Sequence, residues 1–120
     1  IKFETVGELS LIADNACAHQ FMLGQTCPEI WRGLKLSEHL VVGWINSNSR
    51  YKGIGSNVLG DPVNSLLWFL NESSKQKLVI NEGDFVTTGT ATKPMPFQMG
   101  DKIIADFGKL GEIFCQIKDV

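Results

Sequence analysis

A single helix with a clear start signal constrains the fold of this chain more than any other feature. Asp61 can accept hydrogen bonds from the free N–H groups of a first helical turn, and Pro62 suits the first helical position. Apolar residues at helical spacing follow over residues 63–70, and Trp68 and Phe69 widen that apolar face. A helix of this kind has to be covered, so we expect it to be the buried central helix of a mainly β domain.

The glycines before this helix do not form a nucleotide-binding motif. Gly53 and Gly55 begin a G-x-G-x-x-G pattern, but Val58 occupies its third glycine position. Gly55 and Gly60 have the spacing of a phosphate-binding loop, but Asp61 stands where the lysine is required and would repel a phosphate. We therefore interpret these glycines as sites of tight backbone geometry. The residues with expected structural roles are Gly55, Gly60, Asp61 and Pro62.

Length and composition exclude several classes of protein. The 120 residues suit one domain, 1–120, and a net charge of −2 without a basic block argues against a nucleic-acid partner or an anionic membrane surface. The apolar run Leu40–Ile45 is far too short to span a membrane. Three cysteines without C-x-x-C spacing are typical of reduced thiols, so we expect a cytoplasmic protein without a membrane partner.

The rest of the chain predicts short strands, about seven in all, and therefore a β-rich mixed α+β fold. Two hairpins are expected, one from Leu40–Asn46 with Arg50–Gly55 and one from Lys102–Phe107 with Glu112–Ile117. The other expected elements are a short helix within residues 1–16 that ends near residues 14–15, strands at His19–Leu23, Leu78–Ile80 and Phe85–Thr90, a turn at residues 81–84, and loops over Gln25–Ser37 and Ala91–Met99.

Two polar segments are candidates for chemistry. Asp14 and Asn15 close an apolar segment, where helix capping and a functional role are equally compatible with the sequence. Gly89 and Thr90 end a threonine-rich segment whose N–H and hydroxyl donors could hold an anionic group, and Lys93 could add charge. The alternative for this second segment is a strand followed by a turn. A zinc site at Asp14, Cys17 and His19 lacks a second pair of ligands.

A series of collinear motifs resembles the 2-keto-4-pentenoate hydratase / oxalocrotonate decarboxylase family, within the fumarylacetoacetate hydrolase-like superfamily. The resemblance runs along nearly the whole chain and corresponds to the C-terminal half of those enzymes. The motifs are Ile12–Ala16, Phe21–Gly24, Asn57–Trp68, Gly83–Asp84, Val86–Thr90, Gly100–Asp101 and Ala105–Gly111.

The resemblance implies a fumarylacetoacetate hydrolase-like β-roll and a 2-oxo acid substrate held on Mg²⁺ or Mn²⁺. In the family, an E-x-E pair and a further acidic residue hold the ion, and they lie upstream of the matching segment. This chain contains no E-x-E, has Ser10 where the family has an acidic residue, and has no counterpart of the family's catalytic lysine. We therefore expect no metal or other cofactor for this chain alone. The implied substrate-binding residues are Asp14, Asn15, Gly89, Thr90 and Lys93.

Three functions follow from this resemblance. The first is a truncated or stand-alone hydratase/decarboxylase-like module that is not catalytically competent alone but retains a pocket for a small 2-oxo acid. The second is part of an active metal-dependent 2-hydroxy-2,4-dienoate hydratase or 2-oxo acid decarboxylase. The third is a non-catalytic oligomeric scaffold. Because half of the fold leaves sheet surface uncovered, we expect a homo-oligomer.

Overall fold

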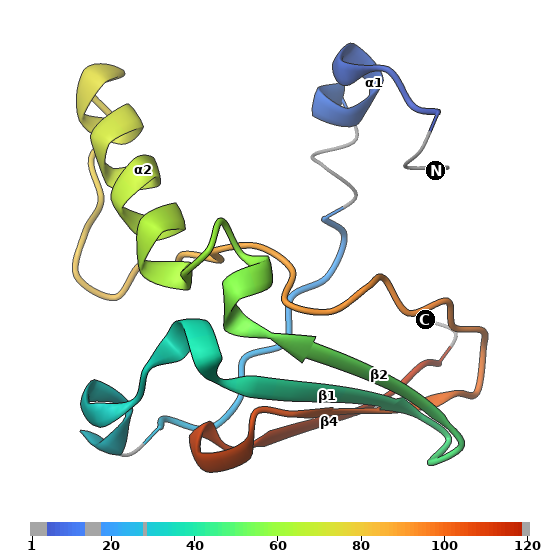
Figure 1. Cartoon of the computed structure of the whole chain (residues 1–120). Helices are drawn as coiled ribbons and strands as arrows, with labels where there is room; N and C mark the ends of the chain where they lie inside the picture. The colour runs from blue at the N-terminus through green and yellow to red at the C-terminus, as the bar shows by residue number, and fades with distance from the viewer. Residues whose placement is uncertain (1–4, 14–17, 28, 119–120) are drawn as a thin grey trace.

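The computed structural model describes residues 5–13, 18–27 and 29–118. Its centre is an antiparallel sheet of four strands in the order β2-β1-β3-β4, formed by β1 (Leu40–Ile45), β2 (Ser49–Ile54), β3 (Lys102–Asp106) and β4 (Glu112–Gln116). Figure 1 shows this sheet as one layer, with the two helices standing on the same side of it. Both predicted hairpins are confirmed, and β1 joins them by pairing with β3.

The two hairpins are locked together at the turn between β1 and β2. Asn46 and Ser47 have positive φ values of 51° and 62°, which reverse the chain tightly. The amide of Asn46 donates to Oδ1 of Asp101 at 2.6 Å, and the N–H of Lys102 donates to Oδ1 of Asn46 at 2.9 Å. The N–H of Gln98 also donates to Asp101 at 2.9 Å, so this buried carboxylate is well satisfied.

One face of the sheet carries the core. Val41, Gly43 and Ile45 are buried and alternate along β1, which places them on the same face. The register puts Gly53 of β2 opposite Val41 and Ala105 of β3 opposite Gly43, so small and β-branched residues make up this face. The buried hydrophobic residues within the described chain are Val41, Ile45 and Val58.

The long helix α2 (Pro62–Lys75) begins as predicted, since the N–H of Val63 donates to Oδ1 of Asp61 at 2.9 Å and Pro62 is the first helical residue. The expectation that α2 is buried is wrong. Leu67 is 54% exposed and Trp68 62% exposed, and only Ser73 of this helix is buried. The physical reason is visible in Figure 1, where α2 projects away from the sheet, so that Val63, Leu67, Trp68 and Leu70 stay exposed.

Several predicted strands are also wrong. The described chain forms four strands rather than about seven, because His19–Leu23, Leu78–Ile80 and Phe85–Thr90 find no strand to pair with among the described residues. The turn at residues 81–84 is confirmed by the N–H of Asp84, which donates to the carbonyl of Asn81 at 3.1 Å. The loop over Ala91–Met99 contains no strand, as predicted.

The N-terminal third is mostly irregular. A short helix, α1 (Glu8–Ala13), confirms the predicted helix in residues 1–16, and its predicted end near residues 14–15 lies outside the described residues. The predicted loop over Gln25–Ser37 contains two 3-10 turns, η2 (Glu29–Gly33) and η3 (Leu36–Glu38). Two more, η4 (Gly55–Asn57) and η5 (Gly108–Leu110), follow β2 and β3 respectively.

The chain is more open than its length requires. Its radius of gyration is 15.8 Å, whereas a compact domain of this length has about 13.6 Å. Its accessible surface is 9729 Å², compared with about 6,450 Å² for a compact monomer of this mass. A large surface that a compact domain would bury is therefore exposed.

Candidate functional site

The segment that connects α2 to β3 crosses the core face of the sheet above two glycines of that sheet, Gly43 and Gly53. We call residues 89–95 the strap; it belongs to the orange trace that passes between α2 and the sheet in Figure 1. A Cβ atom on Gly43 would lie 2.3 Å from Sδ of Met95, and one on Gly53 would lie 2.3 Å from the carbonyl oxygen of Ala91. Only glycine at these two strand positions lets the strap approach the sheet this closely.

Residues of the turn after β2 fix the strap at its other side. The amide of Asn57 donates to the carbonyl of Ala91 at 2.8 Å. Val58, which is buried, contacts the backbone at Gly89, where φ is +121°. The turn η4 is itself held in place, because a Cβ on Gly55 would lie 1.8 Å from the carbonyl oxygen of Leu36. The chain from Gly55 to Val58 therefore connects η3 to the strap.

The strap and the sheet enclose a pocket of about 240 Å³, which we call the strap pocket. Its polar groups come mainly from the strap, and its apolar wall comes from β1, β3 and the side chain of Met95. The lining residues are Val41, Val42, Gly43, Gly89, Thr90, Ala91, Thr92, Met95, Ala105, Asp106 and Phe107.

The structure brings some of the predicted site residues together and leaves others apart. Gly89 and Thr90 both line the strap pocket. Lys93 is exposed and does not line it, although it lies on the same strap. Asp14 and Asn15, the other two predicted substrate-binding residues, lie outside the described residues.

The predicted structural residues surround the start of α2. Gly60 has φ +80°, in the left-handed region that favours glycine, and its N–H donates to the carbonyl of Ser56 at 3.0 Å. This bond turns the chain from η4 into the Asp61–Pro62 start of the helix.

The strap carries hydrogen-bond donors without protein partners in the described chain, at Gly89 and Thr90. Within the described residues, the backbone N–H groups of Gly89 and Thr90 donate no hydrogen bond, and the hydroxyl of Thr90 has no protein partner. Unpaired donors at a turn attract a carboxylate or a similar oxyanion. A small acid could place its carboxylate at this end of the pocket and its apolar part against Met95 and Phe107.

The described residues do not form a metal centre. No group of three or more His, Cys, Asp or Glu side chains in the described ranges is arranged to hold an ion. Asp106, the acidic residue of the strap pocket, instead accepts a hydrogen bond from the N–H of Gly108 at 2.7 Å. The set of donors in this part of the chain does not fit the Mg²⁺ or Mn²⁺ that the sequence resemblance implies, since a hard divalent cation requires several oxygen ligands.

Two residues of the site carry no role in the sequence interpretation. Asn57 lies inside one of the motifs but has no predicted role, and Met95 lies in a segment predicted only to be a loop. A signal for the strap does exist in the sequence, because Gly43 and Gly53 interrupt two strands at positions where a side chain would normally pack.

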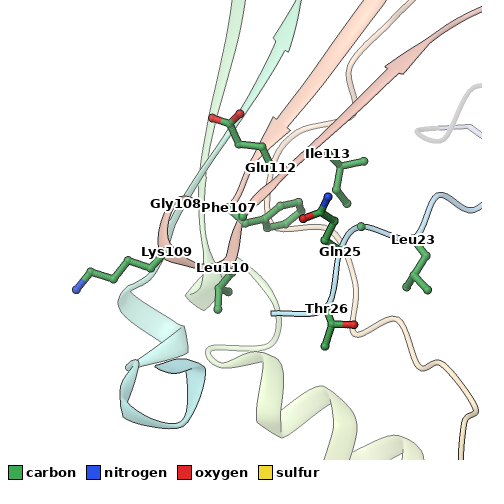
Figure 2. A pocket seen from close by; sticks show the side chains of 11 residues that line it. Leu23, Gln25, Thr26, Phe107, Gly108, Lys109, Leu110, Glu112 and Ile113 are labelled. Atoms are coloured by element: carbon green, nitrogen blue, oxygen red, sulfur yellow. The ribbon is translucent and has the colours of Figure 1, made fainter. Parts of the chain in front are cut away.

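A larger hollow of about 500 Å³ lies at the turn between β3 and β4, against residues 23–26. Figure 2 shows the side chain of Gln25 beside the ring of Phe107 in this hollow, whereas Lys109 and Glu112 point away from it. Within the turn, the N–H of Phe107 donates to the carbonyl of Gly111 at 2.9 Å. None of the predicted substrate-binding residues lines it, so we place the candidate site under the strap.

A charge effect on pKa occurs away from the strap pocket. The hydrogen bond from Lys35 to Glu38, at 2.5 Å, and the negative charge of Glu38 raise the pKa of Lys35 above its usual value. Both side chains are exposed, and neither lines the strap pocket, so this pair stabilises the start of η3 only slightly.

The antiparallel sheet and α2 match part of the oxalocrotonate decarboxylase fold in solved structures. The 4-oxalocrotonate decarboxylase from Pseudomonas putida G7, complexed with magnesium and adipate, superposes with a TM-score of 0.83 at 27% identity, over 97% of this chain and 44% of that chain. The same enzyme complexed with calcium and acetate gives a TM-score of 0.79 at 28% identity, over 91% of this chain and 42% of that chain.

Sequence comparison gives the same result. The chain is 29% identical to a 2-oxo-hept-4-ene-1,7-dioate hydratase of Escherichia coli over 88% of this chain and 39% of the relative. It is 32% identical to a 4-oxalocrotonate decarboxylase of Pseudomonas sp. (strain CF600) over 79% of this chain and 36% of the relative. These matches confirm the resemblance to the hydratase/decarboxylase family, and the chain spans less than two fifths of either curated relative. No family model matches the sequence.

None of the helices within the described residues is both long and apolar enough to cross a lipid bilayer.

Proposed function

We propose that this chain is a hydratase/decarboxylase-like module that binds a small 2-oxo acid through its carboxylate, under the strap, and is not catalytically competent alone. The observation that carries the proposal is the strap pocket, whose lining includes both an apolar wall and Gly89 and Thr90, whose donors have no protein partner in the described chain. The N–H groups of the strap and the hydroxyl of Thr90 hold the carboxylate, and Met95 and Phe107 exclude water from the carbon chain. The solved decarboxylase holds acetate in one structure and adipate in the other, and both are carboxylates.

The remaining chemistry belongs to residues that the described chain does not supply. If a complete site held a divalent ion, that ion would supply Lewis-acid chemistry at the 2-oxo group, and the solved decarboxylase is complexed with magnesium in one structure and calcium in the other. The proposal that other residues hold such an ion is supported by the absence of an E-x-E pair in this sequence and by the lack of an acidic cluster among its described residues. What the strap contributes is orientation of the substrate, because a carboxylate held at fixed donors places the neighbouring carbon in one position.

The large accessible surface of the chain supports the proposal that it is part of a larger fold. The chain superposes on the decarboxylase over 97% of its length at a TM-score of 0.83, so its open shape is the shape of this segment within a larger fold. We propose that residues 1–120 act as the C-terminal half of a fumarylacetoacetate hydrolase-like roll and that the other half covers α2. The surface in excess of a compact monomer, about 3,300 Å², is in the range of an obligate interface.

The first test is calorimetric titration of the chain with 2-oxopentanoate, with and without Mg²⁺. We expect binding that Mg²⁺ does not strengthen. Thr90→Val should weaken it by about 1–3 kcal/mol, because a carboxylate oxygen loses its hydroxyl donor. Thr87→Val is the matched control, since Thr87 is exposed and lies outside the strap pocket.

Two outcomes would contradict the proposal. Equal loss in both threonine variants would remove Thr90 from the site. Binding that requires Mg²⁺ would show that this chain holds the ion itself, which would favour the active metal-dependent hydratase or decarboxylase.

The oligomeric scaffold is the second candidate, and the exposed apolar face of α2 favours it. In the absence of the other half, a second copy of this chain is the partner that can cover α2, so we expect a homo-oligomer in sedimentation experiments. Trp68→Glu should shift the population towards monomer, because Trp68 is 62% exposed on that face. A stable monomer that binds no 2-oxo acid would exclude both candidate functions.

A further inference from the structure

We propose that the face of the sheet opposite the strap binds the same face of a second copy of this chain, about a two-fold axis that runs parallel to the strands. We call this face the open face; it carries the even-numbered residues of β1, β2, β3 and β4. The inference goes beyond the proposed function, because it concerns neither the strap pocket nor the apolar face of α2.

The strand register assigns the even-numbered residues to the open face. Side chains alternate along a strand, and the strap lies above Gly43 and Gly53, which are odd-numbered partners of odd-numbered residues. Asp106 borders the strap pocket, but this alternation directs its side chain to the open face. Figure 1 shows both helices and the strap on the other side of the sheet. Accordingly, Phe114 on the open face is 59% exposed, whereas the residues on either side of it in β4 are half-buried.

A row of apolar side chains crosses the middle of the open face. Trp44, Ile104 and Phe114 lie opposite one another on β1, β3 and β4. Leu40, at the start of β1, adds a further exposed apolar side chain. A sheet face that meets only water normally carries polar residues, whereas β1 is apolar on both faces, as is typical of a strand that is covered on both sides. The apolar row therefore indicates a contact surface.

Charges of opposite sign stand at the two edges of this face. Arg50 and Lys52 lie on β2, and the guanidinium of Arg50 is 5.0 Å from the centroid of the Trp44 ring. Asp106 and Glu112 lie opposite each other on β3 and β4. Because β2 and β4 are the outer strands, one edge of the face is basic and the other is acidic. Such a face is complementary to a rotated copy of itself.

This polarity determines which arrangement of two copies is favourable. Sheets that pack face to face keep their strands nearly aligned, and a two-fold axis parallel to the strands places β2 of one copy on β4 of the other. Lys52 then meets Glu112 of the second copy, and Trp44 meets its Ile104. An axis across the strands would place β2 on β2 and bring the two basic edges together. Lys102 lies at the end of β3 away from the acidic residues and takes no part in this pairing.

The size of the open face predicts a weak dimer. Four strands, spaced about 4.8 Å apart and about 17 Å long, outline roughly 300 Å² on each copy. A standard interface buries about 800 Å² per partner. The dimer should therefore dissociate on dilution, and changes at its charged edges should shift its dissociation constant measurably.

A charge exchange between the two edges tests the contact. The experiment is sedimentation equilibrium of the full chain carrying Trp68→Glu, which removes the exposed apolar contact of α2, and we expect a monomer–dimer equilibrium. Lys52→Glu and Glu112→Lys should each weaken the dimer on the order of tenfold, because the axis repeats each change at two contacts. The double variant should restore the dimer. Since β1 and β3 separate β2 from β4 within one chain, this restoration requires contact between two copies.

Two further variants complete the experiment. Lys93→Glu makes the same charge change at an exposed position of the strap and should leave the dissociation constant unchanged. Phe114→Ser removes an exposed ring from the apolar row and should favour the monomer. Lys52, Glu112 and Phe114 are exposed, so each variant should retain the circular dichroism of the parent chain.

The outcomes decide between the open face and other surfaces. A monomer at every concentration overturns the inference and leaves the open face to a partner other than this chain. A dimer that withstands Lys52→Glu and Phe114→Ser forms through another surface, which also overturns it. Failure of the double variant to restore the dimer excludes the axis parallel to the strands. Each of these results leaves the 2-oxo acid site under the strap standing, because the strap lies on the other face.

Discussion

The sheet with its strap and the long helix α2 show two different relations between sequence and burial. In the sheet, apolar residues such as Val41 and Ile45 are buried because β1 is paired on both sides and the strap crosses its face. In α2, equally apolar residues such as Leu67 and Trp68 remain exposed. The sheet and its strap bury the apolar residues between them, whereas α2 carries an apolar surface suited to a partner.

Gly55→Ala should have the largest effect, because it disturbs the contact between η3 and η4 beside the sheet. The new Cβ would lie 1.8 Å from the carbonyl oxygen of Leu36, so η3 and η4 would have to separate. We expect a loss of about 4 kcal/mol or more in the free energy of unfolding, measured by chemical denaturation. Gly33→Ala is the control, since nothing lies within 4 Å of its Cβ position. Similar stability of the two variants would mean that the junction is not tightly packed.

A pair of truncations tests the contrast itself. Ile45→Ala should cost about 2–5 kcal/mol, because Ile45 is 7% exposed and its removal leaves a cavity. Leu67→Ala should cost less than about 1 kcal/mol in the isolated chain, because Leu67 is 54% exposed. Equal costs, measured by denaturation at a low protein concentration, would show that α2 is covered and that α2 and the sheet do not differ in burial.

Asn57→Asp should release the strap from η4 and from the sheet. The change removes the N–H donor to the carbonyl of Ala91 and places a carboxylate against it, which should cost about 1–1.5 kcal/mol. The methyl resonance of Met95 in ¹³C NMR would report the release, because Met95 packs on Gly43. Asn64→Asp is the matched control, since its amide donates to the carbonyl of Leu59 and not to the strap. A Met95 resonance that moves equally in both variants would contradict the anchoring role.

Asp61→Ala should have the smallest effect, about 0.5–1 kcal/mol. It removes the acceptor for the N–H of Val63 at the start of α2 and leaves the sheet unchanged. Helix content from circular dichroism should fall slightly, whereas Asp61→Asn should retain it, because asparagine caps a helix as well as aspartate does. A loss of the circular dichroism signal of the sheet in Asp61→Ala would mean that α2 and the sheet are coupled more strongly than their contacts indicate.

Local signals in the sequence predicted the elements that depend on local chemistry. Asp61 and Pro62 fix the start of α2, and alternation with turn residues predicts both hairpins. Burial of α2 was not predictable in this way, because whether Trp68 is covered depends on what the rest of the molecule places beside it. Phe85–Thr90 failed as a strand for the same reason, since strand propensity forms no strand without a pairing partner.

In the candidate site, too, features with a local sequence signal differ from features that depend on tertiary contacts. Gly89 and Thr90 have a local signature, since donor-rich residues surround a glycine, and both line the strap pocket, but their contact with a substrate stays a prediction. Lys93 does not line it, since a position within a loop does not determine which side chains face a cavity. Asn57 and Met95 depend on contacts across more than 30 residues of sequence, from Asn57 to Ala91 and from Gly43 to Met95, and no local pattern contains such contacts.

The absence of a side chain at Gly43 has a consequence for how this pocket could diversify. The sheet contributes only backbone at that point, so the floor of the cavity is the same whatever residue the strap places above it. A single codon, that of Met95, can then enlarge, shrink or charge the space while the hydrogen-bonded ladder of β1 and β3 stays intact. The backbone that forms the floor of the cavity and the side chain that lies above it are thereby free to evolve separately.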